Sequence, residues 1–234
     1  MLAFVAAEAR EFAGLLRKAE RVDKLNWPLD FARRIWLNGK AAVLVANGPG
    51  PKLAGEAVEI AQGREELTGL VSTGFCGALD PALKPLEIFV PSEILLPSRD
   101  REGAVLHPLA CTRGSVANGA LLSVDRVASS AAEKCELHAT TGAAAIEMEA
   151  AGVAAKAKEY NLPFYCIRVV TDTAGESFPL DFNRTRDPDG RFSRMKIIAA
   201  ALGSPRVFSK LIQLNNRCKA ASQALGDFIA DTRF

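Results

Sequence analysis

The 234-residue sequence has few histidines and no closely paired cysteines, and both shortages exclude classes of site. Only His107 and His138 are present, so a histidine-rich metal centre is excluded. The five cysteines are odd in number and widely spaced, and none forms a CxxC pair. This pattern is typical of reduced thiols rather than of a disulfide framework or a zinc site. We therefore expect neither a bound metal nor an organic cofactor.

Long hydrophobic runs and a strong charge imbalance are also absent. No window approaches the roughly 18 apolar residues that span a bilayer. The chain runs from Met1 straight into an apolar stretch, without the preceding positive charge of a signal peptide. A formal net charge of +2 gives no argument for a nucleic-acid partner. These observations predict a cytoplasmic protein that does not bind nucleic acid.

Apolar residues make up 49% of the sequence, which is enough for one sizeable core. Short runs rich in Val and Ile alternate with Ala-rich stretches of helical periodicity. This alternation predicts a single α/β domain over residues 1–234, with a central sheet covered by helices on both faces. We expect strands at 2–7, 41–46, 70–73, 85–94, 117–124 and 164–171, and helices at 8–20, 53–62 and 144–160.

Three of the expected strands end in residues suited to a binding site, because ligands of α/β sheets gather at the carboxyl ends of strands. Residues 47–50 (Asn-Gly-Pro-Gly) and 72–78 (Ser-Thr-Gly-Phe-Cys-Gly-Ala) combine a strand exit with glycines, although plain turns would look the same. Residues 168–172 (Arg-Val-Val-Thr-Asp) end in a carboxylate. Arg168 and Asp172 share a face of an extended strand, as a structural ion pair or as an active-site pair.

Residues 146–150 (Ile-Glu-Met-Glu-Ala) lie in the expected helix 144–160, among small apolar side chains. A stretch of this kind packs tightly, so its two carboxylates are hard to explain as a solvated face. We therefore interpret Glu147 and Glu149 as functional.

Together these motifs resemble the nucleoside phosphorylase family, particularly its nucleosidase branch, which hydrolyses methylthioadenosine and adenosylhomocysteine. Residues 72–79 resemble the family's Gly-rich strand exit, 146–150 its ribose-binding Val-Glu-Met-Glu-Ala, and 168–172 its catalytic strand. The resemblance spans residues 1 to about 175. It implies a mixed central sheet flanked by helices, cleavage of the N-glycosidic bond of a purine nucleoside, and a homo-oligomer, most simply a dimer.

The resemblance also implies roles for single residues. Asp172 would be the general acid that protonates the purine at N7, which requires it to hold a proton near neutral pH. Glu149 would accept hydrogen bonds from the ribose hydroxyls, above the apolar surface of Met148. Glu11, with Glu8 as the alternative, would activate a water that Arg168 helps to position. The predicted substrate-binding residues are Glu149, Met148, Glu147, Gly74, Phe75, Val127 and Ala128.

The sequence departs from the family's phosphate site. Phosphorolytic members carry arginines in the first loop and before the Gly-rich segment, where this chain has Ala-Ala-Glu at 6–8 and Ser72, and they carry a serine where it has Phe75. This favours hydrolysis over phosphorolysis. Phosphate remains a possible co-substrate if Arg168 or the arginines of the loop 175–190 replace the missing ones.

A second departure lies in residues 123–128, which otherwise resemble the base-binding loop of the nucleosidases. Val127 stands where those enzymes place a phenylalanine against the purine. The purine pocket is therefore expected to differ in shape, and the substituent on the 5′ carbon stays open.

The segment 191–234 is an extension that simple nucleosidases lack, and from 191 to 226 it has seven Lys or Arg residues and no Asp or Glu. It predicts either packing helices with a solvated basic face or a surface in peripheral contact with anionic lipid. The hopanoid-associated phosphorylases, which act on an adenosylated lipid, look similar here and in the loop before it.

Three alternatives to a simple nucleosidase follow. A phosphorylase acting on a lipid-linked adenosine and a catalytically silent nucleoside-binding protein both stay open. A nucleotide-binding dehydrogenase is disfavoured, because the sequence lacks a GxGxxG strand–turn–helix fingerprint.

Overall fold

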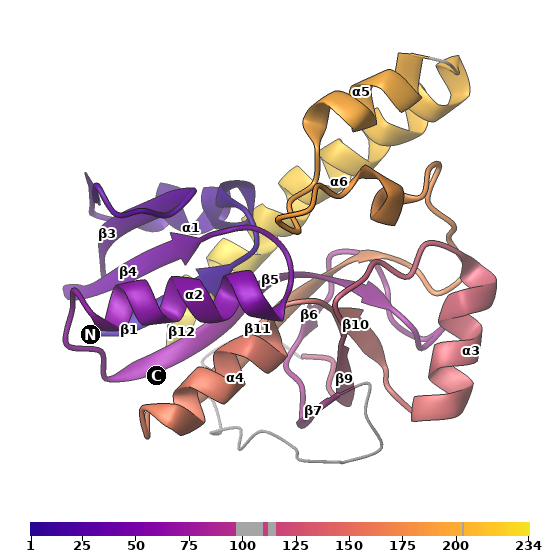
Figure 1. The fold of residues 1–234 in the computed structure, drawn as a ribbon. Coiled ribbons are helices and arrows are strands. Elements are labelled where there is room, and N and C mark those ends of the chain that lie inside the picture. Colours follow the sequence, from indigo (N-terminus) through magenta and orange to yellow (C-terminus); the bar gives the residue numbers. More distant parts are fainter. Residues whose placement is uncertain (97–109, 112–115, 203) are drawn as a thin grey trace.

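The computed structural model describes residues 1–96, 110–111, 116–202 and 204–234. Within them a ten-stranded mixed sheet runs through the molecule, with helices on both faces (Figure 1). The expected fold class is thereby confirmed. The strands of this sheet are β1 (Leu2–Ala6), β2 (Arg21–Lys24), β3 (Phe31–Leu37), β4 (Lys40–Ala46), β5 (Gly69–Ala78), β6 (Ile88–Phe89), β7 (Glu93–Leu95), β9 (Ala120–Ser123), β10 (Ala145–Glu147) and β11 (Phe164–Asp172).

The strands follow the order β2-β3-β4-β1-β5-β10-β9-β7, while β11 pairs with β5 and β6. The pairs β1–β4, β1–β5, β5–β11, β9–β10 and β7–β9 are parallel. A separate two-stranded sheet joins β8 (Ala110–Cys111) to β12 (Thr232–Arg233). The helices are η1 (Ala9–Phe12), α1 (Ala13–Lys18), α2 (Pro51–Gln62), α3 (Ala131–Thr141), α4 (Ala150–Glu159), η2 (Phe182–Thr185), α5 (Arg194–Leu202) and α6 (Pro205–Asp231).

The core forms two layers because successive side chains of a strand point to opposite faces. Ala3 and Val5 of β1 pack on one face, in the same cluster as buried residues of α2 and α4. Phe4 and Ala6 pack on the other, with buried residues of α1 and α6. Both faces are covered, so the central strand β1 is apolar throughout.

The expected helix 144–160 is wrong in its first part. Ala145–Glu147 forms β10, which pairs antiparallel with β5 and parallel with β9, and α4 begins only at Ala150. Alanine has the highest helix propensity, but backbone pairing with two neighbouring strands outweighs it here. The Glu-Met-Glu motif therefore lies at a strand-to-helix turn and not on a helix.

Other expected bounds also change. The strand expected at 70–73 continues through the Gly-rich segment as β5, because β10 and β11 pair with that segment on its two sides. The strand expected at 85–94 is divided into β6 and β7, and the strand β3 was not anticipated. The strands expected at 2–7, 41–46 and 164–171 lie close to their predicted bounds.

The C-terminal segment forms the two helices α5 and α6. Helix α5 and the first part of α6 extend away from the sheet (Figure 1), whereas Ala221, Leu225 and Ile229 near the end of α6 are buried against it. In the part of the chain that the structure describes, no helix is both long and apolar enough to cross a bilayer.

Candidate active site

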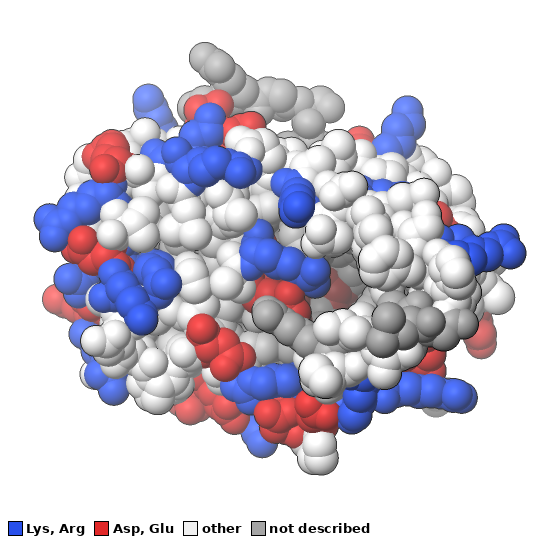
Figure 2. All heavy atoms as spheres, turned by 90° about the horizontal axis from the view of Figure 1, so that it is seen from above, with Lys and Arg blue, Asp and Glu red and all other residues white. Residues whose placement is uncertain are grey.

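A cavity of about 570 Å³ opens at the carboxyl ends of β5 and β11, and its size suits a small organic ligand. Seen from the side of α5 and α6, the surface is hollowed, and acidic side chains are visible inside (Figure 2). The cavity brings together residues from η1, the β10–α4 turn, β11 and the segment 126–128. Eight of the ten predicted site residues line it: Glu11, Phe75, Val127, Ala128, Glu147, Met148, Glu149 and Asp172.

Arg168 does not line the cavity but lies behind its carboxylates, fully buried on β11. Its guanidinium forms a salt bridge with Glu147 and a longer contact, 3.5 Å, with Glu149 Oε2. It also donates to Ser72 Oγ at 2.6 Å and to the Thr73 carbonyl at 3.0 Å. Arg168 therefore fixes the carboxylates in place rather than facing a ligand.

The β10–α4 turn holds its two carboxylates in different ways. Glu147 accepts hydrogen bonds from the backbone N–H groups of Glu149 and Ala150, at the start of α4. Glu149 Oε1 accepts from the Gly50 N–H at 3.1 Å. The glycine-containing segment 47–50 is thus more than a plain turn, because it contacts the Glu149 carboxylate.

Glu11 is held by backbone N–H groups. Its carboxylate accepts from the Phe75 and Glu8 backbone N–H groups, each at 2.8 Å. Gly74 also does not line the cavity, but it leaves room for this contact: a Cβ there would lie 2.5 Å from Glu11 Oε1 and 3.1 Å from Arg168 Nη1. Glu8, the alternative to Glu11, lines the cavity too and pairs with Arg10.

Burial changes the acidity of this carboxylate cluster. Removal from water raises the pKa of Glu149 to about 8, and the neighbouring charge of Glu147 acts in the same direction against the attraction of Arg168. Burial also raises the pKa of Glu11 from its ordinary value. Near neutral pH, such groups can exchange protons with a ligand.

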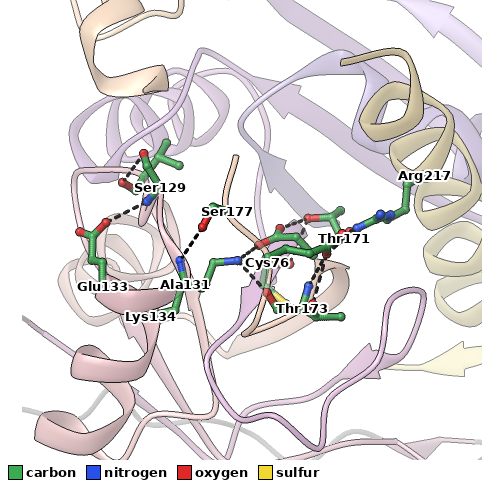
Figure 3. A network of polar contacts seen from close by, with 12 residues as sticks. Cys76, Ser129, Ala131, Glu133, Lys134, Thr171, Thr173, Ser177 and Arg217 are labelled. Atoms are coloured by element: carbon green, nitrogen blue, oxygen red, sulfur yellow. Dashed lines mark hydrogen bonds and ion pairs between the residues drawn. The ribbon is translucent and has the colours of Figure 1, made fainter. Parts of the chain in front are cut away.

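Asp172 lies at the end of β11 and is paired with a buried lysine. Lys134 reaches from α3 to the carboxylate and forms a salt bridge with it; both side chains are almost completely buried (Figure 3). Lys134 also donates to the Thr173 carbonyl at 2.9 Å, and Thr171 Oγ1 donates to Asp172 Oδ1 at 2.7 Å. Arg168 and Asp172 thus each have another partner, and the strand carries no ion pair between them.

The segment with Val127 and Ala128 forms another part of the wall. The Val127 N–H donates to Asn183 Oδ1 at 2.8 Å, and Asn183 Nδ2 donates back to the Val127 carbonyl at 2.9 Å. The Phe178 N–H donates to the Ser129 carbonyl. The loop 175–190 is therefore tied to this segment by its own backbone and amide groups.

Above the carboxylates the wall of the cavity is apolar. Phe178 packs edge-on against Phe182, which packs against Phe192. The helices α5 and α6 complete this wall with aliphatic side chains. These apolar lining residues are Phe178, Phe182, Phe192, Ile197, Leu211 and Leu214.

Among the described residues three cations line the cavity, and each is already paired with a carboxylate. The pairs are Arg10 with Glu8, Arg126 with Glu133, and Lys134 with Asp172. The loop arginines considered as replacements for a phosphate site, Arg184 and Arg186, pair with Asp181 and Asp125 and do not line the cavity. An anion in the cavity would therefore meet cations whose charge is already compensated.

Lys134 and Arg10 line the cavity, but the sequence did not predict either as a site residue. Lys134 lies in a polar helical segment, and its partner Asp172 is 38 residues away, so no local pattern marks it. The apolar side chains of α5 and α6 were also missed, because nothing in their spacing assigns them to a cavity.

A comparison with protein families finds a match in the part of the chain that forms this cavity. The family model described as Phosphorylase superfamily matches residues 105–200, which include the β10–α4 turn and β11. The match contains the motifs at residues 146–150 and 168–172, whereas the Gly-rich segment 72–79 lies outside it. No curated protein sequence matches the chain.

Solved structures of nucleosidases share this fold over the whole chain. The 5′-methylthioadenosine/S-adenosylhomocysteine nucleosidase from Neisseria meningitidis, in complex with methylthio-immucillin-A, is similar with a TM-score of 0.72 and 21% identity, covering 98% of this chain and 96% of that chain. The S-adenosylhomocysteine nucleosidase from Streptococcus pyogenes, in complex with 5-methylthiotubericidin, has a TM-score of 0.74 and 14% identity, with coverages of 98% and 94%. At these identities the likeness shows that the chain shares the fold of these nucleosidases.

Proposed function

We propose that this chain cleaves the N-glycosidic bond of a purine nucleoside by hydrolysis. The observation that carries the proposal is the meeting, in one cavity, of Glu11, the turn with Glu149, and Asp172. These residues come from three distant segments, and each is anchored by backbone or charged partners. The similar nucleosidases, whose structures hold nucleoside analogues, provide the reaction class.

The carboxylates fit the needs of this reaction. Breaking the C1′–N9 bond places positive charge on the sugar, which the carboxylates at the cavity wall stabilise. Glu149, next to Met148, accepts hydrogen bonds from the ribose hydroxyls. Glu11 takes a proton from the attacking water, and Arg168 acts through the carboxylates that it positions. Asp172 delivers a proton to N7 of the leaving purine.

Hydrolysis is favoured over phosphorolysis because the lining cations are already paired with carboxylates. Phosphate would meet the carboxylates of Glu8 and Glu11 instead of free donors. The proposed reaction uses no cofactor. A cytoplasmic location and a homo-oligomer, most simply a dimer, stay predictions, and light scattering after size-exclusion chromatography tests the second.

Release of free purine from adenosine, methylthioadenosine, adenosylhomocysteine and inosine, with and without phosphate, tests the proposal. We expect phosphate-independent release by the wild type and a loss of about 100-fold or more in Asp172→Asn, since a general acid contributes on that scale. Asp23→Asn, on the outer strand β2, is the matched control and should keep full activity. Strict phosphate dependence would overturn hydrolysis, and binding without release would make the chain a nucleoside-binding protein.

A lipid-linked adenosine is a second candidate substrate, and the apolar wall favours it. The same two helices that line the cavity expose large apolar side chains to solvent, beside the basic residues of α5 and α6. The exposed residues are Met195, Ile198, Phe208 and Ile212. An acyl-like substituent on the 5′ carbon could follow this surface from the cavity to an anionic membrane.

Co-sedimentation with anionic vesicles at low salt tests this candidate. We expect binding that Phe208→Ser weakens, while Val22→Ser, at another exposed apolar residue, on β2, leaves it unchanged. Equal pelleting with and without vesicles would count against peripheral membrane contact.

A further inference from the structure

Lys134 is a buried cation that none of the family motifs accounts for. It lies in α3 with 1% of its surface exposed, and it lines the cavity beside Asp172. Its ammonium lies 5.3 Å from the centre of the Phe178 ring and donates to Asp172 and to the Thr173 carbonyl (Figure 3). Burying an ammonium costs free energy, so a buried lysine in the wall of a cavity indicates a functional role.

The number of donors points to that use. An ammonium has three N–H donors, and two of them have protein acceptors in Asp172 and Thr173. The third is left for the cavity. Asp172 in turn accepts from both Lys134 and the Thr171 hydroxyl, so its carboxylate is held at a fixed place in the cavity wall.

The groups around the pair do not supply another proton. Arg217 from α6 donates to the Thr171 carbonyl at 3.0 Å and to Glu176 at 2.7 Å, and these two opposite charges compensate each other. Burial raises the pKa of the Cys76 thiol on β5 well above its ordinary value, and that of the Cys218 thiol on α6 to about 11. Both thiols therefore stay neutral in the range where the enzyme would work.

We propose that Lys134 is a catalytic residue that supplies the proton which Asp172 passes to the purine. This inference rests on the proposed function. A proton moves from Lys134 Nζ to Asp172 and from Asp172 to purine N7, while the C1′–N9 bond breaks and its electron pair stays with the purine. Water oxygen bonds to C1′, and its proton goes to Glu11. Lys134 then regains a proton from solvent, and Glu11 releases its proton to solvent.

The pH dependence of Lys134→Met tests this role. Without Lys134 the reaction has only the proton that Asp172 itself carries, and a carboxyl carries less proton as pH rises, so the ratio of variant to wild-type kcat/KM should fall as pH rises. We expect a ratio within about tenfold of unity near about pH 5.5 and a loss of about 100-fold or more near about pH 9. A ratio that stays constant with pH would show that Lys134 is only structural.

Two further variants keep the test decisive. Lys156→Met removes a lysine that pairs with Glu59 and Glu159 away from the cavity, and its ratio should stay near unity at every pH. If Lys134→Met does not fold, Lys134→Gln keeps a donor for Asp172 without a transferable proton and should show the same pH trend.

A separate readout distinguishes this inference from the proposed function. If the wild type releases no purine, the proposed function fails, and calorimetric binding of adenine decides the role of Lys134. Weakening of adenine binding by about tenfold in Lys134→Met would support contact of the Lys134–Asp172 pair with the base. Unchanged binding would overturn the inferred role of Lys134.

Discussion

At the scale of single residues, the site is a group of carboxylates that share one guanidinium. Glu147 and Glu149 both contact Arg168, and Glu11 lies across Gly74 from it. One positive charge cannot balance three buried negative charges, which is why burial raises the pKa values of Glu11 and Glu149. The cluster therefore retains protons that an isolated surface carboxylate would lose.

Gly74→Ala should lower activity through Glu11. Gly74 has φ +130°, and an added Cβ would displace the Glu11 carboxylate from the Phe75 N–H. We expect kcat to fall by about 100-fold, since a small misplacement of a catalytic group has effects on this scale. Gly142→Ala is the matched control: it also has a positive φ, but nothing lies within 4 Å of its Cβ position. Equal loss of kcat in both variants would attribute the effect to backbone strain alone.

The residues of the site could be predicted from the sequence only where a motif carries them. The motif around Glu149 and the strand end at Asp172 were assigned from the resemblance, and both line the cavity. Lys134 could not be found, because burial of a helical lysine depends on a contact across 38 residues. Arg168 was identified, but its place behind the carboxylates depends on packing that the sequence does not display.

At the scale of elements, the β10–α4 turn shows how the fold makes a site from an ordinary-looking sequence. Small residues around the Glu-Met-Glu motif predicted one continuous helix, yet Ala145–Glu147 completes the sheet between β5 and β9. The strand then delivers Glu147 to the first N–H groups of α4, where a carboxylate is favourable. Propensity describes single residues, whereas pairing with two strands is a property of the whole sheet.

Gly226→Ala should separate α6 from α1 and η1. Helices α1 and α6 cross so closely that a Cβ on Gly226 would lie 2.2 Å from the Gly14 carbonyl carbon. The backbone of α1 can move aside only at a cost in free energy. We expect the free energy of unfolding to fall by about 2 kcal/mol or more, measured by urea denaturation. Gly63→Ala, at the end of α2, is the control because its Cβ would meet nothing closer than 3.4 Å. Equal stability of the two variants would contradict this crossing.

At the scale of the whole molecule, the sheet supplies the carboxylates and the C-terminal helices supply the apolar wall. The alternation of strands and helices was enough to predict this α/β architecture. The contribution of α5 and α6 to the cavity was not predictable, because it depends on how a long helix leaves the sheet (Figure 1). Function and stability are linked here, since the buried acids that suit the site also make folding sensitive to pH.

Stability should fall as pH rises, because the folded chain raises the pKa of Glu149 to about 8 from an ordinary value of 4.5. Between these values the folded protein holds a proton that the unfolded chain has lost, so unfolding becomes easier with increasing pH. Glu149→Gln cannot ionise, and it should therefore lose less free energy of unfolding between about pH 5 and about pH 9, by a few kcal/mol. Urea denaturation at both pH values measures the difference, with the exposed Glu66→Gln as control. The same pH dependence in Glu149→Gln and wild type would show that Glu149 is already ionised in the folded chain, and the ribose site would then hold a fixed negative charge throughout this range.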